Sequence, residues 1–291
     1  MVFKQTELDE IHAIQLEMLI ELDRICRRHG IKYIISGGTL LGAVRNGKFI
    51  PWDDDIDVRM DRAEYIKFAQ ACERELDGNK YFFQDHNTDS DYPWYYGKLR
   101  YIHSCYTRSG QEHLKMKNGI FIDVMPADGL PNTAWKRNII IKIVFLLKKF
   151  LYAEVGRMAE PNVLKRCVYG LMNIVPKNYI FDALDNISGH YMDFKYENVT
   201  SYSFVKCGQK EYTKRKWHYD SIEISFEEVK VLAPRAYHEW LIMTYGEDYM
   251  MPPPKEERVG HNEISKLCIE EVEYESDFIS SRKRDENIKN D

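Results

Sequence analysis

An acidic run inside an apolar stretch limits the folds and sites that this chain can form more than any other feature of its sequence. Residues 53–57 read DDDID, so four carboxylates fall within five positions, and residues 50–52 (IPW) and Val58 flank them. A solvated acidic loop is the ordinary explanation for such a run, but the apolar flanks predict partial burial. Buried like charges repel and raise one another's pKa, so a divalent cation is the natural compensation. Carboxylate oxygens are hard ligands that suit Mg²⁺ or Mn²⁺.

The spacing of the acidic residues predicts a two-metal site. Residues 55–58 alternate polar and apolar, which predicts a strand with Asp55 and Asp57 on one face, roughly 6.5 Å apart. Asp123 lies in a second apolar strand, residues 119–124, which Pro126 is expected to end. Two ions held by three carboxylates favour in-line displacement at phosphorus, because they stabilise both the attacking and the leaving oxygen.

A glycine turn precedes the acidic run. Ser36, Gly37 and Gly38 follow an expected strand at residues 31–35 and precede an expected short helix at residues 39–45. Such a turn can present backbone amides and a helix N-terminus to a phosphate group. An amphipathic helix at residues 6–29 is expected before it, with Gly30 as its stop.

Three segments together resemble one protein family. They are SGGTLLGAVRNGKFIPWDDDIDV at residues 36–58, GIFIDVMPADGLP at residues 119–131 and YGEDYMMPPPKEERVGH at residues 245–261. The pattern is similar to the LicD family, which is related to fukutin and the fukutin-related protein, and the similarity spans roughly residues 15–265. The resemblance implies an α+β fold of the nucleotidyltransferase type, with a mixed β-sheet core flanked by helices.

The resemblance also implies an activity and its metal ligands. The expected reaction is Mg²⁺-dependent transfer of phosphocholine from CDP-choline to a glycan hydroxyl, of the teichoic acid precursor or lipopolysaccharide type, with release of CMP. The family's metal-binding residues fall on Asp55, Asp57 and Asp123, which would hold two Mg²⁺ ions, with Mn²⁺ as the alternative. We expect Asp53 to orient this group and Asp54 to have a structural or substrate-binding role.

Several basic residues are candidates for phosphate binding. Arg45 follows the glycine turn, and Lys98 and Arg100 share one face of an expected strand, from which they would balance the acidic face. A solvated loop is the alternative for Arg45. Arg258 and His261 follow a Pro252–Pro254 run that can fold the chain back over the site, where they would touch the nucleotide or the acceptor; a plain surface position is the alternative.

An aromatic cluster is a candidate choline pocket. Aromatic faces attract a quaternary ammonium group, which cannot donate hydrogen bonds, so a cage for choline is one interpretation of the cluster; a core or surface-strand role is the more common one. The cluster contains Tyr92, Trp94, Tyr95 and Tyr96, and Trp52 is a further candidate wall.

Three other functions are compatible with the same residues. The first is a nucleotidyltransferase that acts on a small sugar or an antibiotic. The second is transfer of another phosphoalcohol, ribitol or glycerol phosphate, from its CDP derivative. The third is a non-catalytic glycan-binding protein of the same fold.

The sequence divides into four parts. We expect a catalytic core at residues 1–130, a helical insertion at 131–197, a part that completes the core at 198–270 and a charged, flexible tail at 271–291. Within the insertion, residues 139–151 are apolar but too short to span a bilayer. They predict either a buried core helix or a helix lying on a membrane surface.

Composition narrows the class of partner and the location. A formal net charge of −5 argues against a nucleic-acid-binding protein, because phosphate neutralisation favours a basic surface. Six cysteines without a CxxC pair predict reduced thiols and a cytoplasmic protein. The polar, acidic residues 1–10 lack the pattern of a secretory signal. If the acceptor is a lipid-linked glycan, the enzyme must act at the inner face of the cytoplasmic membrane.

Overall fold

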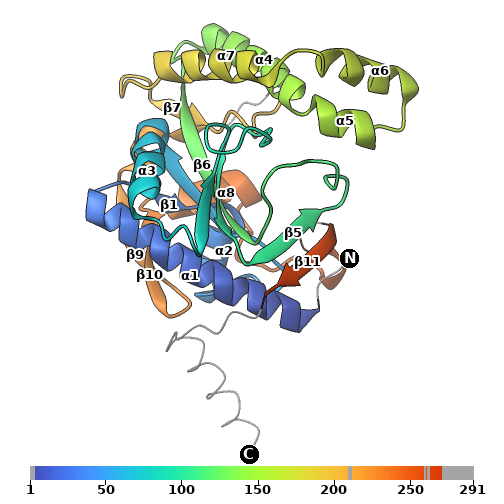
Figure 1. The fold of residues 1–291 in the computed structure, drawn as a ribbon. Helices are drawn as coiled ribbons and strands as arrows, with labels where there is room; N and C mark the ends of the chain where they lie inside the picture. The colour runs from blue at the N-terminus through green and yellow to red at the C-terminus, as the bar shows by residue number, and fades with distance from the viewer. Residues whose placement is uncertain (1–3, 209–211, 259, 261–262, 271–291) are drawn as a thin grey trace, which may run out of the picture.

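Two parallel strands, β2 (Asp57–Asp61) and β6 (Phe121–Leu130), form the centre of the fold. Strands pair around them in the order β1-β2-β6-β4-β3, with β1 (Ile34–Ile35), β4 (Gly97–Tyr101) and β3 (Tyr81–Gln84) antiparallel to their neighbours. The far end of β6 continues the sheet through β7 (Asn198–Thr200) and β8 (Thr213–Lys214). This computed structural model, shown in Figure 1, describes residues 4–208, 212–258, 260 and 263–270, and its class is mixed α+β.

Helices and two antiparallel strand pairs complete the described part of the molecule. The predicted N-terminal helix is confirmed as α1 (Gln5–His29), which buries an apolar stripe and ends at Gly30 in the left-handed conformation. Strand β5 (Ser104–Arg108) pairs with β11 (Ile264–Ile269), and β9 (Ser221–Phe226) with β10 (Val229–Pro234). The other α-helices are α2 (Gly37–Asn46), α3 (Arg62–Glu75), α4 (Ala134–Leu151), α5 (Ala153–Ala159), α6 (Val163–Met172), α7 (Lys177–His190) and α8 (Tyr237–Tyr245).

Pro126 does not end β6, contrary to the sequence prediction. The strand runs on to Leu130, and all ten of its residues are buried. Asp123 donates its backbone N–H to Ile56 on the β2 side, so the nitrogen of Pro126, three positions later, faces the opposite edge. On that edge β4 pairs with residues 121–124 and β7 with residues 128–130, which leaves Pro126 between the two partners. The missing N–H therefore costs no ladder hydrogen bond.

One pair of cysteines is bonded, which corrects the expectation of reduced thiols throughout. Cys105 on β5 and Cys268 on β11 form a disulfide and lie directly opposite each other in the strand register. Their separation of 163 positions hid this pairing from the sequence. Among the described residues, Cys26, Cys72, Cys167 and Cys207 are free thiols.

Helices α4 to α7 form a lobe above the sheet (Figure 1). In α4, Ile141, Val144 and Leu151 enter a second hydrophobic cluster with α7, so one face of the predicted 139–151 helix is core. Ile139, Ile143 and Leu146 are exposed on the same helix. Of the helices that the structure describes, none combines the length and apolar character needed to cross a membrane.

A buried arginine joins the lobe to the sheet. Arg215 lies 3.1 Å from the carboxylate of Asp61, and both side chains are 1% exposed. Its guanidinium also donates to the carbonyls of Met192 and Asp193, and to that of Tyr191 at 2.8 Å. A single side chain therefore ties the end of α7 to the end of β2.

Replacing Arg215 with Met should cost about 3–5 kcal/mol in the free energy of unfolding, because it leaves the Asp61 carboxylate buried without its counter-charge. Denaturant unfolding measures this cost. Arg235→Met is the matched control, since Arg235 pairs with Asp220 at 2.8 Å but both side chains are at least 60% exposed; its cost should stay below about 1 kcal/mol. Equal costs for the two variants would show that burial of the Arg215 pair is unimportant.

Candidate active site

The parallel register of β2 and β6 brings three predicted carboxylates together. Asp57 is the first residue of β2 and pairs directly with Asp123 of β6. Asp55 lies two residues before β2, and one carboxylate oxygen from each of the three residues lies within 4.8 Å of the others. Asp123 is buried, whereas Asp55 and Asp57 are half-buried, so the group is both concentrated and accessible.

The acidic run is a loop at its start, which corrects the predicted strand at residues 55–58. Because β2 begins only at Asp57, Asp55 does not share a strand face with it. The loop instead folds so that Asp53, Asp54 and Asp55 also lie with carboxylate oxygens within 4.8 Å of one another. Asp55 therefore belongs to both groups of three.

Two side chains of helix α1 form hydrogen bonds with the backbone of this acidic loop. His12 donates from Nε2 to the carbonyl of Asp53 at 2.7 Å. Gln15 donates to the carbonyl of Asp54 at 2.9 Å and to that of Phe121 at 3.1 Å, which links the loop to β6. The sequence analysis missed both residues. Their signal was a pair of polar side chains on the apolar face of an amphipathic helix.

The glycine turn packs directly against the carboxylates. A β-carbon on Gly37, whose φ is +55°, would lie 2.1 Å from Asp57 Oδ2, and one on Gly38 would lie 2.1 Å from Asp53 Oδ2. Ser36 precedes α2 and donates its backbone N–H to the carbonyl of Asp57 at 3.0 Å. Helix α2 begins at Gly37, two residues earlier than the sequence predicted. Its N-terminus therefore starts at the acidic group itself.

Burial and mutual repulsion make the acidic group electrostatically unfavourable without a cation. Burial, followed by the charges of Asp55 and Asp123, raises the pKa of Asp57 well above its usual range. Burial and the charges of Asp55 and Asp54 do the same to the pKa of Asp53. The donors are carboxylate oxygens within a few ångströms of one another, which is the chemistry that Mg²⁺ and Mn²⁺ prefer. The residues therefore fit a divalent cation.

The two predicted β4 cations have different positions. Lys98 is buried beside Asp123 and donates to its carboxylate. Burial lowers the pKa of Lys98 to about 7, with Arg108 and Arg100 adding to the decrease and Asp123 opposing it. Arg100 is directed elsewhere, because it donates to Gln84 Oε1 at 2.7 Å and to the carbonyl of Gly119 at 2.8 Å.

Arg108 of β5 is a basic residue that the sequence analysis missed. Burial opposes its charge, but Tyr96, Asp123 and Asp55 outweigh that effect and raise its pKa. Its neighbour Tyr106 donates a hydrogen bond to the carboxylate of Asp54, which is fully buried. Asp54 therefore has a contact that fits the structural role expected for it.

A second group of residues approaches the acidic group from α2, α8 and the C-terminal segment. Burial lowers the pKa of Arg45, and the charge of Arg258 adds to the decrease. Arg258 lies 5.3 Å from the ring centre of Trp52. Burial and the charges of Asp57, Asp53 and Asp55 raise the pKa of Tyr245 on α8. Tyr245 opens the third sequence segment quoted above, but its role was not predicted. His261 lies outside the described residues.

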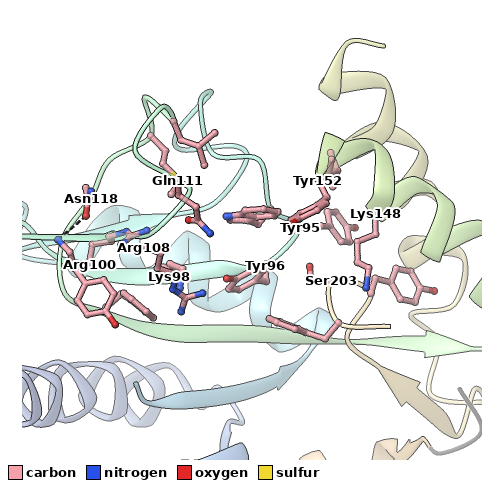
Figure 2. Close-up of a pocket in the computed structure, with 18 of the residues that line it drawn as sticks. Tyr95, Tyr96, Lys98, Arg100, Arg108, Gln111, Asn118, Lys148, Tyr152 and Ser203 are labelled. Carbon is pink, nitrogen blue, oxygen red and sulfur yellow. Dashed lines mark hydrogen bonds between the residues drawn. The ribbon is translucent and has the colours of Figure 1, made fainter. Parts of the chain in front are cut away.

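Two cavities flank the carboxylates. The first, here called the aromatic cavity, has a volume of about 360 Å³. Figure 2 shows Lys98 and Arg108 on its sheet side and Lys148 and Tyr152 on its helical side. The second, here called the glycine cavity, has a volume of about 420 Å³ and is lined by Ser36, Gly37 and Asp57. Phe204 lines both cavities, and Lys98, which pairs with Asp123, lines the first of them.

The predicted aromatic cage is only partly assembled. Trp94, Tyr95 and Tyr96 line the aromatic cavity. Tyr95 already has partners within the protein. Its hydroxyl donates to Asp185 at 2.7 Å, and Arg62 lies 4.5 Å from its ring centre. Two other candidates lie elsewhere: Tyr92 is buried behind Tyr96, and Trp52 lies beside Arg258. Tyr152 of the lobe, 6.2 Å from Trp94 between ring centres, takes a place in the cavity that the sequence did not predict.

Comparison with known families finds one matching domain in the first half of the chain. Residues 30–143 match the LicD/FKTN/FKRP nucleotidyltransferase domain, a range that includes the glycine turn and all three metal-ligand candidates. The chain contains a LicD-family domain. This confirms the family and the enzyme class, a transferase, that the sequence predicted.

Relatives extend the LicD similarity beyond the domain. The chain is 27% identical over 270 residues to the lipopolysaccharide cholinephosphotransferase LicD of Haemophilus influenzae, which covers 89% of this chain and 97% of that protein. It is 42% identical over 45 residues to the human ribitol 5-phosphate transferase FKRP, which covers 16% of this chain and 8% of that one. The similarity to the first relative therefore includes the helical lobe, whereas the second is local.

Proposed function

We propose that this protein transfers phosphocholine from CDP-choline to a hydroxyl group of a glycan and releases CMP. The observation that carries the proposal is the convergence of Asp55, Asp57 and Asp123 within 4.8 Å in a chain that is similar over 89% of its length to a cholinephosphotransferase. The glycine turn before β2 and the later strand carboxylate support a nucleotidyltransferase-type fold for the core. An acceptor of the lipopolysaccharide or teichoic acid type and a cytoplasmic location are parts of the same proposal.

Asp55, Asp57 and Asp123 would hold Mg²⁺, or alternatively Mn²⁺. Because Asp55 belongs to both groups of carboxylates, we propose two ions rather than one. When bound, the ions supply charge stabilisation for the attacking and the leaving oxygens of the displacement.

The chain's own groups would position the donor. The N-terminus of α2 faces the carboxylates and favours a negatively charged diphosphate there. Lys98 and Arg108 would bind phosphate oxygens from the aromatic cavity, and Arg45 and Arg258 are further candidates for phosphate binding. The acceptor oxygen forms a bond to the phosphorus that carries choline, and the bond from that phosphorus to the CMP oxygen breaks. A carboxylate of the acidic group takes the hydroxyl proton, and CMP leaves.

The choline group would occupy the aromatic cavity against Trp94. Replacing Trp94 with Ala should raise the KM for CDP-choline roughly 2- to 30-fold, because a cation–π contact of about 0.5–2 kcal/mol is lost. The KM for CDP-ethanolamine should rise less, since its primary ammonium can be hydrogen-bonded instead. Trp135→Ala, at an exposed position of α4 that does not line the cavity, is the control. An unchanged KM for CDP-choline in Trp94→Ala would show that the choline group does not bind in this cavity.

Product analysis tests the reaction. Purified protein, Mg²⁺, a lipopolysaccharide core oligosaccharide and CDP-choline labelled in the choline methyl groups should give a labelled oligosaccharide and an equal amount of CMP. EDTA should abolish both. A product that carries CMP would show a nucleotidyltransferase, and binding of the glycan without any product would show a non-catalytic protein.

Ribitol phosphate transfer is the second candidate, since the human relative with the local match is named a ribitol 5-phosphate transferase. CDP-ribitol offered in the same assay distinguishes the two donors. A higher kcat/KM for CDP-ribitol than for CDP-choline would reverse the order of the two proposals.

A further inference from the structure

Helix α6 exposes an apolar surface that nothing in the described chain covers. None of its ten residues is buried, and Leu164 and Leu171 are 76% and 68% exposed. These two residues and Val168 are spaced by four and three positions, so they lie on one face of the helix. We call α5, α6 and the following residues to 175 the apolar arm. Met158, Val163, Ile174 and Val175 are the other exposed apolar residues of this arm.

The arm projects from the rest of the molecule. Figure 1 shows α5 and α6 extending sideways from the α4 and α7 pair, away from α1 and the sheet. Helix α6 packs on α5, where Gly156 lies against the ring of Tyr169. A soluble protein seldom leaves such a contiguous apolar surface in water unless it binds something.

Charge identifies the kind of surface that the arm fits. Residues 131–179 carry nine Lys and Arg against two Glu, a net charge of +7. The other residues carry 32 basic and 44 acidic side chains, a net charge of −12. On α6 itself, Lys165 is exposed at the flank of the apolar face. A short helix with an apolar face and basic neighbours has the properties of an interfacial helix on anionic lipids.

We infer that the apolar arm docks this protein on an anionic phospholipid bilayer. The apolar face of α6 enters the boundary between headgroups and acyl chains, while Lys165 and the exposed Arg157 of α5 contact the lipid phosphates. A second copy of the chain fits this face less well, because two copies of residues 131–179, each with a net charge of +7, repel each other. The possible membrane helix predicted from the sequence, residues 139–151, also exposes Ile139, Ile143 and Leu146. Helix α6 differs from it because none of the residues of α6 is buried.

Docking through the arm would bring the aromatic cavity close to the lipid surface. Lys148, Lys149 and Tyr152, at the end of α4, line that cavity, and Tyr152 also contacts Tyr169 of α6 with ring centres 6.1 Å apart. The suggestion that this position gives access to a lipid-linked glycan acceptor rests on the proposed function. The lipid binding itself does not.

Vesicle co-sedimentation tests the inference. The full chain should bind vesicles of equal parts phosphatidylglycerol and phosphatidylcholine, and bind pure phosphatidylcholine at least tenfold more weakly. Leu164→Ser with Leu171→Ser should weaken binding to the anionic vesicles at least tenfold. Lys165→Gln should weaken it roughly fivefold at low salt, since a basic residue near such a surface contributes about 1 kcal/mol.

The control is Ile20→Ser with Ile66→Ser, two exposed apolar residues on α1 and α3, about 40% exposed, whose replacement should leave vesicle binding unchanged. Equal loss in this control, or no vesicle binding by the wild type, overturns the inference. So does a wild-type dimer in sedimentation velocity that Leu164→Ser with Leu171→Ser dissociates, if vesicle binding is absent. Turnover of a soluble oligosaccharide should be the same in all these variants. Vesicle binding by a wild type that transfers no phosphocholine would contradict the proposed function alone.

Discussion

Asp57→Asn should abolish phosphocholine transfer, with kcat/KM falling on the order of 10³-fold or more, and should at the same time make the metal-free protein more stable. Activity falls because Asp57 occupies the centre of the acidic group, paired with Asp123 in the register and within 4.8 Å of Asp55. Stability rises for a different reason. The pKa of Asp57 is raised above its usual value of 3.8, so its ionisation opposes folding at every pH above about 4, and this loss grows as the pH rises toward the folded-state pKa.

Calorimetry and thermal unfolding at pH 7–8 check both effects. In EDTA the Tm of Asp57→Asn should exceed that of the wild type. Added Mg²⁺ should raise the Tm of the wild type and leave that of Asp57→Asn nearly unchanged, because only the wild type keeps the full ligand set. Asp220→Asn, which removes a carboxylate about 60% exposed, should alter neither metal binding nor turnover. Wild-type turnover by Asp57→Asn would refute the proposed metal site.

Gly37→Ala should reduce turnover at least about 100-fold while the fold is retained. The added methyl group would lie 2.1 Å from Asp57 Oδ2, so the carboxylate must turn away from Asp55 and Asp123. The backbone φ of +55° adds a strain of about 1–2 kcal/mol for a residue with a β-carbon. Mg²⁺ affinity should therefore fall together with kcat/KM.

Gly47→Ala separates the two effects. Gly47, at the other end of α2, has a similar φ of +68°, but a β-carbon there would meet nothing within 4 Å. Its variant should lose similar stability in denaturant unfolding and retain turnover and Mg²⁺ affinity. If both glycine variants lose turnover equally, backbone strain in α2 matters and the contact with Asp57 does not.

Local sequence patterns predicted the elements whose causes are local. The apolar period of residues 6–29 and the stop at Gly30 defined α1 to within one residue, because helix periodicity and a left-handed cap are properties of a short segment. The helical character of residues 131–197 was predicted in the same way. The end predicted for β6 at Pro126 was wrong, because whether a missing N–H matters depends on which strand lies beside it.

The candidate site shows the same division. The Asp-x-Asp spacing, the separate apolar strand around Asp123 and the resemblance of three segments pointed to three carboxylates that the structure brings within 4.8 Å of one another. The sequence missed Arg108, Tyr245, His12 and Gln15, whose positions depend on how β5, α8 and α1 lie against the acidic group. The Cys105–Cys268 disulfide was missed for the same reason, since β5 and β11 are far apart in the chain.

The sequence by itself determined the concentration of carboxylates at residues 53–57 and the glycines that precede them, and these predicted a cation site. Only the tertiary structure decided the geometry: the parallel register that places Asp123 beside Asp57, the two cavities that flank them, and the uncovered apolar face of α6. The physical reason is the distance along the chain over which each interaction acts. Charge repulsion and backbone conformation act between neighbours along the chain, whereas pairing, burial and exposure depend on contacts between segments that only folding brings together.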